Sequence, residues 1–369
     1  MDRQDALLML QRFVIELTLA GVESKEDYRK WAKGNDELMC ELFDYVPEAG
    51  MPKVAYLVSP HFHPGLPLVG LNYTPVAHNL LYRYVQGWTT QLRMCRGIVF
   101  DRDAELVALC LPKFFNAAEN AETKVLPARP VEVLEKMDGH CGLHFFYDGD
   151  FHVKTRGSFT HRTAEIAGEL MRSLVAEYEW KSAGIEHLSI ITEVIHPETR
   201  VICKYRGSRL VLIAAYDNRT LEDFTHAKLS ALGKRLGVQT VKRRSFQTTE
   251  AVRKATRDPN MSNREGFVVR FADNRRVKFK NQKYLEQMVA RKLSYSYLML
   301  RWMDGRLEAI LKTLPEEVIP QANMMVEYLK KARRMRRAIK LQRQYLYELV
   351  PPDKSTPYYR KVCRDFLRH

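Results

Sequence analysis

The tetrapeptide Lys136-Met137-Asp138-Gly139 offers a lysine amine that could attack phosphorus, and it follows a short β-type run at residues 131–134. An amine attacks only when it is uncharged part of the time, and neighbouring cations would lower its pKa toward that condition. Attack on an α-phosphate would give a phosphoramidate, a nucleotide bonded covalently to lysine. Alone, the pattern is weak, because three fixed residues are expected by chance in roughly one chain in twenty of this length. Its weight comes from the charged residues around it.

Two lysines and a glutamate on later strands could surround such a phosphate. Lys278 and Lys280 are two apart on a strand, so they share one face, with Phe279 on the other. Two ammonium groups side by side suit the charge that develops on a phosphoryl group. Their strand should pair with the run after Glu265 through the turn at residues 272–274. We therefore expect Glu265 to lie near the same site.

Glu193 lies on a strand face that is otherwise apolar. Its neighbours on that face are Ile191 and Ile195. A buried carboxylate needs a cation, a metal ion or a ligand hydroxyl as its partner. The alternative is an edge strand, with the charge in water.

Cations and aromatic rings also precede Lys136. Residues 93–101 are a basic entry to a strand, and Lys113-Phe114-Phe115 follows the next strand. An aromatic face could stack on a base while Arg or Lys holds phosphates. Core packing is the more common fate of such a Phe-Phe pair.

The elements that must position these residues indicate an α+β fold. Residues 4–45 have helical periodicity, and helices are also expected at 163–180 and 227–236. Between residues 53 and 285 strands dominate, with a hairpin turn at Asp148-Gly149. Strands and helices are mixed and do not alternate strictly. The apolar runs that indicate strands are residues 55–58, 97–100, 106–111, 143–147, 188–195, 210–215 and 266–271.

The chain changes character near residue 286, which predicts two domains. Residues 1–285 form the first, with a helical N-terminal segment at 1–50, and residues 286–369 form an all-helical second domain. The second has 18 Lys or Arg and nine Asp or Glu, and eight of the basic residues lie between Lys330 and Arg343. This stretch is either a solvated helix face or a phosphate-contacting helix. Its buried stripe is expected at residues 325, 329, 332, 335, 339 and 346, and its contacting residues would be Lys330, Lys331, Arg334, Arg337 and Lys340.

Composition limits the class of partner and the compartment. The 369-residue chain has a formal charge of +15, which favours an anionic polymer or nucleotide as partner, although a basic surface can be merely solvated. Its six cysteines are scattered without a CxxC pair, which argues against a zinc site or a disulfide framework. Charges interrupt the N-terminus, and no run of about 18 apolar residues exists, so we expect no signal peptide and no membrane span. A cytoplasmic setting is expected.

The ordered motifs resemble those of the covalent nucleotidyltransferase superfamily of ATP-dependent polynucleotide ligases and capping enzymes. Within it, residues 50–285 are most similar to the phage-type RNA ligase 1 branch, the tRNA-repair RNA ligases. The segments that carry this resemblance are Cys95–Phe100, Pro112–Asn116, Glu135–Gly139 (motif I), Lys154–Ser158 (motif Ia), Thr192–Tyr205 (motif III), Glu265–Val269 (motif IV) and Val277–Lys280 (motif V).

The resemblance implies an ATP-grasp-like ligase domain with a mixed or antiparallel sheet, and a role for each matched residue. Lys136 would accept AMP, Lys278 and Lys280 would grip the α-phosphate, and Asp138 would shape the turn that presents Lys136. The implied magnesium (or manganese) ligands are Glu193 and Glu265, and Glu193 could instead bind the ribose. The implied nucleotide contacts are Arg96, Lys113, Phe115, Glu135, Gly139, Arg156 and Gly266. The chain departs from the family pattern at three places. Arg156 stands where the family usually has lysine, and the other two places are His140-Cys141 and Thr192.

The implied reaction seals RNA. Lys136 would take AMP from ATP, the AMP would pass to a 5′-phosphate end, and a 3′-hydroxyl would displace it. The helical region would be an RNA-substrate domain, docking a cleaved tRNA or another single strand, with ends prepared by a separate kinase and phosphatase. Two alternatives remain: a DNA ligase or guanylyltransferase, which usually adds a β-rich domain after motif V, and a non-catalytic RNA-binding protein.

Overall fold

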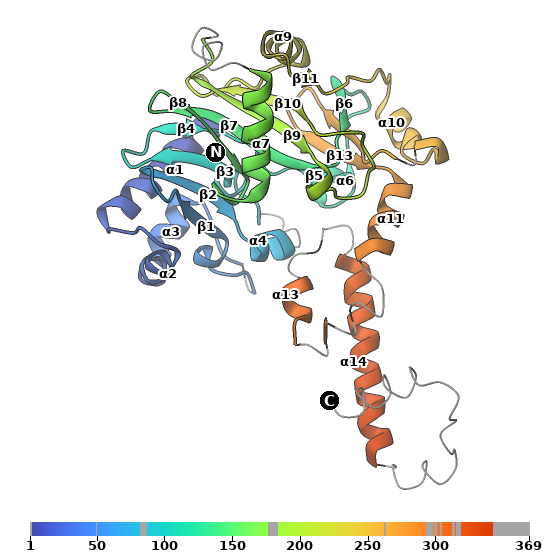
Figure 1. Cartoon of the computed structure of the whole chain (residues 1–369). Coiled ribbons are helices and arrows are strands. Elements are labelled where there is room, and N and C mark those ends of the chain that lie inside the picture. The colour runs from blue at the N-terminus through green and yellow to red at the C-terminus, as the bar shows by residue number, and fades with distance from the viewer. Residues whose placement is uncertain are drawn as a thin grey trace. The chain divides into compact units, whose positions relative to one another are not determined.

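The computed structural model divides into two compact units, residues 1–284 and 285–369 (Figure 1). It describes residues 2–48, 50–81, 87–175, 184–261, 263–292, 298, 301–302, 305–311, 314 and 319–341. No helix within these ranges is long and apolar enough to cross a membrane. Each unit is considered by itself.

Three helices form the N-terminal segment, as predicted: α1 (Arg3–Leu19), α2 (Lys25–Gly34) and α3 (Asp36–Leu42). Side-chain caps start the first two, because Asp2 accepts a hydrogen bond from the Asp5 amide (2.9 Å) and Ser24 accepts one from the Asp27 amide (3.1 Å). The apolar stripe of α1 is buried in one core with the strands that follow. The helices therefore cover the first sheet.

The first sheet is antiparallel, in the order β1 (Val58–Phe62), β2 (Leu68–Tyr73), β3 (Arg96–Asp101) and β4 (Leu106–Ala108). Two helices, α4 (Pro75–Leu80) and α5 (Thr90–Met94), connect β2 to β3.

Two predicted strands of this region were wrong in their bounds. Residues 54–56 form a short 3-10 helix (η1, Val54–Tyr56), because the amide of Leu57 bonds locally to the carbonyl of Val54 (2.8 Å). The run at 106–111 leaves the sheet after Ala108, since the amide of Leu109 bonds to the side-chain Oγ of Ser189 (2.7 Å) and not to the main chain of a neighbouring strand. Both segments are apolar because they are buried, which periodicity alone cannot distinguish from a strand.

The second sheet has the order β11-β10-β9-β7-β8, antiparallel except for the parallel pair β10 and β11. The hairpin between β7 and β8 turns at Asp148 (φ 51°) and Gly149 (φ 74°), as Asp-Gly predicted. The predicted helix at 163–180 begins one residue earlier, as α7, and its last part, residues 176–180, lies outside the described residues. The bounds are β7 His140–Tyr147, β8 Asp150–Thr155, α7 Arg162–Leu174, β9 Leu188–Ile195, η3 Pro197–Thr199, β10 Arg209–Asp217, α9 His226–Leu236 and β11 Gln239–Thr240.

The third sheet has the order β5-β13-β12-β6 and carries the predicted lysines. Strands β6, β12 and β13 are antiparallel, and β5 joins β13 in parallel. Gly266 is paired with Lys136 on one side and with Lys280 on the other. The α+β class and the mixed sheet are confirmed. The bounds are β5 Phe115–Asn116, α6 Ala121–Lys124, β6 Glu132–Lys136, α10 Thr249–Ala255, η4 Pro259–Met261, β12 Gly266–Arg270 and β13 Arg276–Lys280.

Every element described after β13 is helical: α11 (Gln282–Lys292), α13 (Leu307–Leu311) and α14 (Ile319–Leu341). On α14, Leu329 of the expected stripe is buried, Met325 is half-buried, and Lys330, Lys331 and Arg334 are exposed. The side chains of residues 332, 335, 337, 339 and 340, and all of residue 346, lie outside the described residues.

Candidate active site

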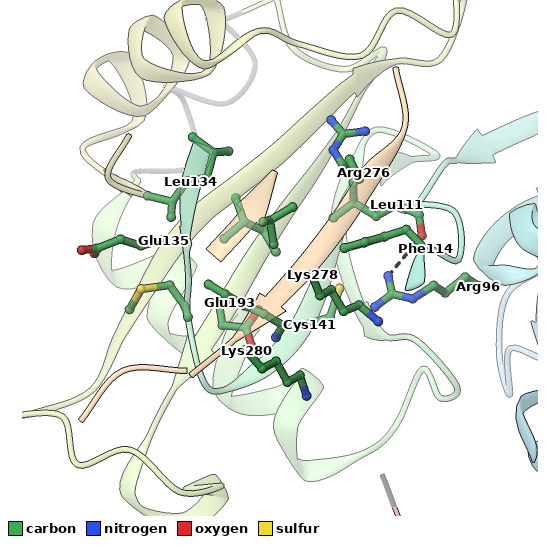
Figure 2. A pocket seen from close by; sticks show the side chains of 15 residues that line it. Arg96, Leu111, Phe114, Leu134, Glu135, Cys141, Glu193, Arg276, Lys278 and Lys280 are labelled. Atoms are coloured by element: carbon green, nitrogen blue, oxygen red, sulfur yellow. Dashed lines mark hydrogen bonds between the residues drawn. The ribbon is translucent and has the colours of Figure 1, made fainter. Parts of the chain in front are cut away.

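A cavity of about 170 Å³ lies between the second and third sheets (Figure 2). We call it the Lys136 cavity. It brings together Lys136, Glu193, Lys278, Lys280 and Arg96, which are up to 184 positions apart in the sequence. Its other lining residues are Leu111, Phe114, Leu134, Glu135, Met137, Cys141, Ile213, Val241, Val268 and Arg276.

Lys136 ends β6 and lies beside a buried carboxylate. Its Nζ is 2.7 Å from Oε2 of Glu265, and Nζ of Lys280 is 3.2 Å from the other oxygen, Oε1. The Glu265 side chain is only 5% exposed, whereas that of Lys136 is 20% exposed. One carboxylate therefore holds two ammonium groups side by side, and the Lys136 amine is still open to the cavity.

Two glycines allow the strands to approach so closely. Gly266 has φ +147°, and a Cβ there would lie 2.0 Å from the carbonyl oxygen of Phe279. A Cβ on Gly139 would lie 2.4 Å from the carbonyl oxygen of Val194. Neither distance is possible for a real side chain, so the register that joins Lys136 to Glu265 and Lys280 requires glycine at 266.

Asp138 holds the turn after Lys136 and does not line the Lys136 cavity. Its Oδ2 accepts hydrogen bonds from the amides of Ile202 (2.8 Å) and Cys203 (2.5 Å), and its Oδ1 accepts one from the Tyr284 hydroxyl (2.7 Å). Its own amide donates to the Tyr205 hydroxyl oxygen (3.0 Å). Sequence reasoning missed Tyr284, whose only signal is an isolated tyrosine four residues after motif V.

Glu193 is on an interior strand, so the edge-strand alternative is wrong. Strand β9 lies between β10 and β7, where Glu193 is paired with Val211 and Cys141. Its Oε1 accepts a hydrogen bond from the Gly139 amide (2.9 Å). Burial raises the pKa of Glu193 to about 7; the charge of Lys136 opposes this rise and that of Glu265 adds to it.

Cations line one side of the cavity and apolar side chains another. Nζ of Lys278 lies 4.8 Å from the ring centre of Phe114, and Arg96 donates to the carbonyl oxygen of Leu111 (3.1 Å). The side chains of Lys278, Phe114 and Arg96 lie close together in Figure 2. Arg276, which sequence reasoning missed, pairs with Asp223 (2.6 Å). Leu134, Ile213, Val241 and Val268 supply the apolar part.

Of the predicted aromatic pair, Phe114 lines the cavity and Phe115 does not. Phe114 and Phe115 are adjacent in the sequence, so their side chains point to opposite sides. Phe115 is 1% exposed and packs edge-on against Trp88. Lys113 is also buried, with Nζ 5.1 Å from the Phe115 ring centre and 5.5 Å from that of Trp88. The expectation that Phe115 contacts adenosine therefore does not fit its position.

Two further expected nucleotide contacts have protein partners of their own. Arg156 donates to the Tyr73 hydroxyl (2.8 Å) and does not line the Lys136 cavity. Glu135 lines it, but its carboxylate accepts from Nε of Arg244 (2.8 Å) and Nη1 of Arg264 (3.2 Å), and it points away from the cavity in Figure 2. In motif Ia the fully buried residue is Lys154, which donates to the carbonyls of Gly97 and Arg156 (both 3.2 Å), and burial lowers its pKa to about 8.

Glu193 and Glu265 are the carboxylates expected to hold magnesium, and Glu265 pairs with both Lys136 and Lys280. No group of three or more His, Cys, Asp or Glu in the described ranges could hold a metal. Magnesium commonly uses one or two carboxylates together with substrate phosphates and water, so a set of two carboxylates suits it. The five described cysteines are all free, and Cys363 lies outside the described residues.

Known proteins resemble part of the chain. A protein of Thermovibrio ammonificans named "Putative RNA ligase" is 30% identical over 135 residues, which cover 35% of each chain. The chain thus matches about a third of that relative's length. A mutant of the Naegleria gruberi RNA ligase, solved with ATP and Mn, has 18% identity over 47% of this chain and 56% of that one, with a TM-score of 0.40. The same ligase with PPi has 20% identity over 44% and 53%, with a TM-score of 0.36.

A family model carries the assignment. The model of the family described as RNA ligase matches residues 94–284, which is just over half of the chain. The match includes Lys136, Glu193, Glu265 and both lysines of β13. The chain belongs to the RNA ligase family.

Proposed function

We propose that the protein is an ATP-dependent ligase that joins 5′-phosphate and 3′-hydroxyl RNA ends through a lysyl-AMP intermediate. The observation that supports this most strongly is the grouping at the end of β6. There the Lys136 amine is open to the cavity, 2.7 Å from a buried carboxylate and beside a second lysine on the same carboxylate. A binding protein would not need a reactive amine held in this way.

The first step forms the bond between protein and nucleotide. Nζ of Lys136 attacks the α-phosphorus of ATP, the N–P bond forms, and the P–O bond to pyrophosphate breaks. The proton lost by the amine has the Glu265 carboxylate as its nearest acceptor. Lys278 and Lys280 neutralise charge on the α-phosphate, and Arg96 binds the outgoing phosphates.

The apolar side of the cavity suits the base. Leu134, Val241 and Val268 offer flat apolar contact, and the half-buried ring of Phe114 offers a face for stacking. Glu193 lines the cavity, where its carboxylate would bind the ribose or a water on the bound metal ion. Bound magnesium, held by Glu265 and Glu193, would neutralise phosphate charge.

The next two steps move the adenylate and seal the strand. The 5′-phosphate oxygen of RNA attacks the phosphorus of lysyl-AMP, which breaks the N–P bond and returns the amine to Lys136. The 3′-hydroxyl oxygen then attacks the activated 5′-phosphorus, and AMP leaves. Each step forms one bond to phosphorus and breaks one, so no further reactant is required.

One assay separates RNA ligation from the related reactions. The protein is incubated with ATP and broken single-stranded RNA, and separately with nicked duplex DNA, both with 5′-phosphate and 3′-hydroxyl ends. We expect a sealed RNA product. Sealing of the nicked DNA alone would assign a DNA ligase. Transfer of GMP in a third incubation, with GTP in place of ATP, would assign a guanylyltransferase.

We also propose that residues 286–369 choose the RNA, as a helical domain with a surplus of basic residues. Exposed Lys330, Lys331 and Arg334 on α14, with Arg337 and Lys340 of the same helix, would contact phosphates. The expected substrate is a cleaved tRNA in the cytoplasm, with ends prepared by a separate kinase and phosphatase. Faster sealing of cleaved tRNA than of an unstructured strand would support this choice, and equal rates would contradict it.

A further inference from the structure

A second cavity lies in the N-terminal part of the first unit, between α2 and the strands β1 and β2. Its volume is about 600 Å³. We call it the α2 cavity, after the helix whose basic face forms one wall, and Figure 1 shows this helix beside β1. None of the sequence motifs discussed above lies on it.

The α2 wall is a row of cations without counter-charges. Lys25, Arg29 and Lys33 line the cavity and are exposed. They are four residues apart, so they occupy one helix face at intervals of about 6 Å along the axis. Among the residues that the structure describes, none of the three forms an ion pair, and no Asp or Glu lines the cavity. Lys30, on another face of α2, pairs with Glu26 (3.0 Å).

Aromatic rings line the same cavity as these cations. Tyr56 is 56% exposed, although it is a large ring at the cavity wall, and Tyr73 lines the same cavity from the end of β2. Sites for single-stranded nucleic acid combine a basic row that follows the backbone with accessible aromatic rings that stack on bases. Here the accessible ring is that of Tyr56, because Tyr73 is only 4% exposed.

Two buried polar atoms on the wall have no partner. Asn72 is 8% exposed and Tyr28 is 4% exposed, and both line the cavity. Within the described part of the chain, Oδ1 of Asn72 and the hydroxyl of Tyr28 have no hydrogen-bond partner. Buried polar atoms are nearly always paired. Because both atoms are themselves buried, they do not face the open cavity, and contacts to a ligand come from the basic row and Tyr56.

The α2 cavity adjoins the residues around the Lys136 cavity. Asn72 on β2 is paired with Arg96 on β3, and Arg96 lines the Lys136 cavity. Tyr73 accepts a hydrogen bond from Arg156 (2.8 Å), and its ring centre is 5.8 Å from Nζ of Lys113. Residues that line the α2 cavity are therefore direct neighbours of Arg96, which lines the Lys136 cavity.

We propose that the α2 cavity binds a single-stranded segment of the RNA substrate, with phosphates on Lys25, Arg29 and Lys33 and a base on Tyr56. This inference rests on the proposed RNA ligase function and adds to it a site that holds the strand during sealing.

The test measures RNA binding and lysyl-AMP formation separately, on the full chain. The probe is a 5′-phosphorylated single-stranded RNA, titrated at several salt concentrations. The variants are the triple substitution Lys25→Ala, Arg29→Ala, Lys33→Ala, and Tyr56→Ala with Tyr56→Phe as its conservative partner. Lys30→Ala is the matched control, since it removes a lysine from the same helix but from another face.

We expect the triple variant to bind RNA more weakly and to lower the slope of log K against log salt by about 2, because each lost phosphate contact on a single strand contributes about 0.7. Tyr56→Ala should weaken binding at least about fivefold, the lower end for loss of one stacked base, and Tyr56→Phe should restore it. Lys30→Ala should bind like the wild type, and all variants should form lysyl-AMP at the wild-type rate.

Three results would overturn the proposal: an unchanged slope in the triple variant, an equal loss in Lys30→Ala, or equal binding by Tyr56→Ala and wild type. Absence of lysyl-AMP in the wild-type protein would instead contradict the proposed ligase reaction, and the binding measurement would still decide the α2 cavity. If the triple variant fails to form lysyl-AMP, its fold is lost. The comparison of Tyr56→Ala, Tyr56→Phe and wild type then carries the test.

Discussion

Glu193 should give the stability of the protein a pH dependence that one isosteric substitution removes. Burial raises the pKa of this carboxyl to about 7, from the 4.5 of an exposed glutamate. Between these values the folded protein keeps a proton that the unfolded chain has lost. The free energy of unfolding contributed by Glu193 therefore falls as the pH rises from about 4.5 to about 7 and stays low above that range.

The size of the effect follows from the same two values. Each unit between them corresponds to about 1.4 kcal/mol, so the limit is about 3 kcal/mol. Since the side chain is only half-buried, we expect about 1–3 kcal/mol, which is several degrees in Tm. Glu193→Gln keeps an oxygen for the hydrogen bond from the Gly139 amide and removes only the titration.

The assay compares urea unfolding of the wild type and Glu193→Gln at about pH 5 and about pH 8. Titrating groups that do not interact with Glu193 act equally in both proteins and cancel in the difference. The variant should gain about 1–3 kcal/mol relative to the wild type on going from the lower to the higher pH. A difference between the two proteins that does not change with pH would refute the burial of this carboxyl.

Four further substitutions test how the site is built. Gly266→Ala should unfold the protein or abolish lysyl-AMP formation, because its Cβ would meet a main-chain carbonyl of β13 at 2.0 Å, and circular dichroism with adenylate labelling would show either loss. Tyr284→Phe should cost about 1–3 kcal/mol in urea unfolding, since it leaves Oδ1 of Asp138 without its donor; an unchanged midpoint would contradict the bond. Phe115→Ala should cost about 3–5 kcal/mol of stability, whereas Phe114→Ala should mainly raise the KM for ATP, and the reverse pattern would show that the two rings have been assigned wrongly.

The sequence predicted best those features in which the pattern and the chemistry agree. Strand β9 has the predicted bounds, because its mostly apolar run ends at His196-Pro197. The alternation of Lys278 and Lys280, with a short turn before them, was enough to place Glu265 near Lys136, and the ion pairs confirm that proximity.

Features that depend on distant partners could not be predicted. Phe114 and Phe115 are adjacent and chemically identical, so only the start of β5 decides which ring enters the core. The hydrogen bond from Tyr284 to Asp138 joins residues 146 positions apart, and nothing in the sequence near either residue identifies the other as its partner. The helical turn at residues 54–56 reflects a local hydrogen bond that an apolar run does not reveal.

The central claim is that the amine of Lys136 becomes bonded to adenylate, and intact-protein mass spectrometry tests it most directly. The wild type is incubated with ATP and magnesium and compared with Lys136→Ala and with Lys124→Ala, which removes an exposed lysine outside the Lys136 cavity. The wild type and Lys124→Ala should gain the mass of one adenylate, mapped by peptide fragmentation to Lys136, and Lys136→Ala should gain none. An adduct that persists in Lys136→Ala, or that maps to another residue in the wild type, would contradict the account.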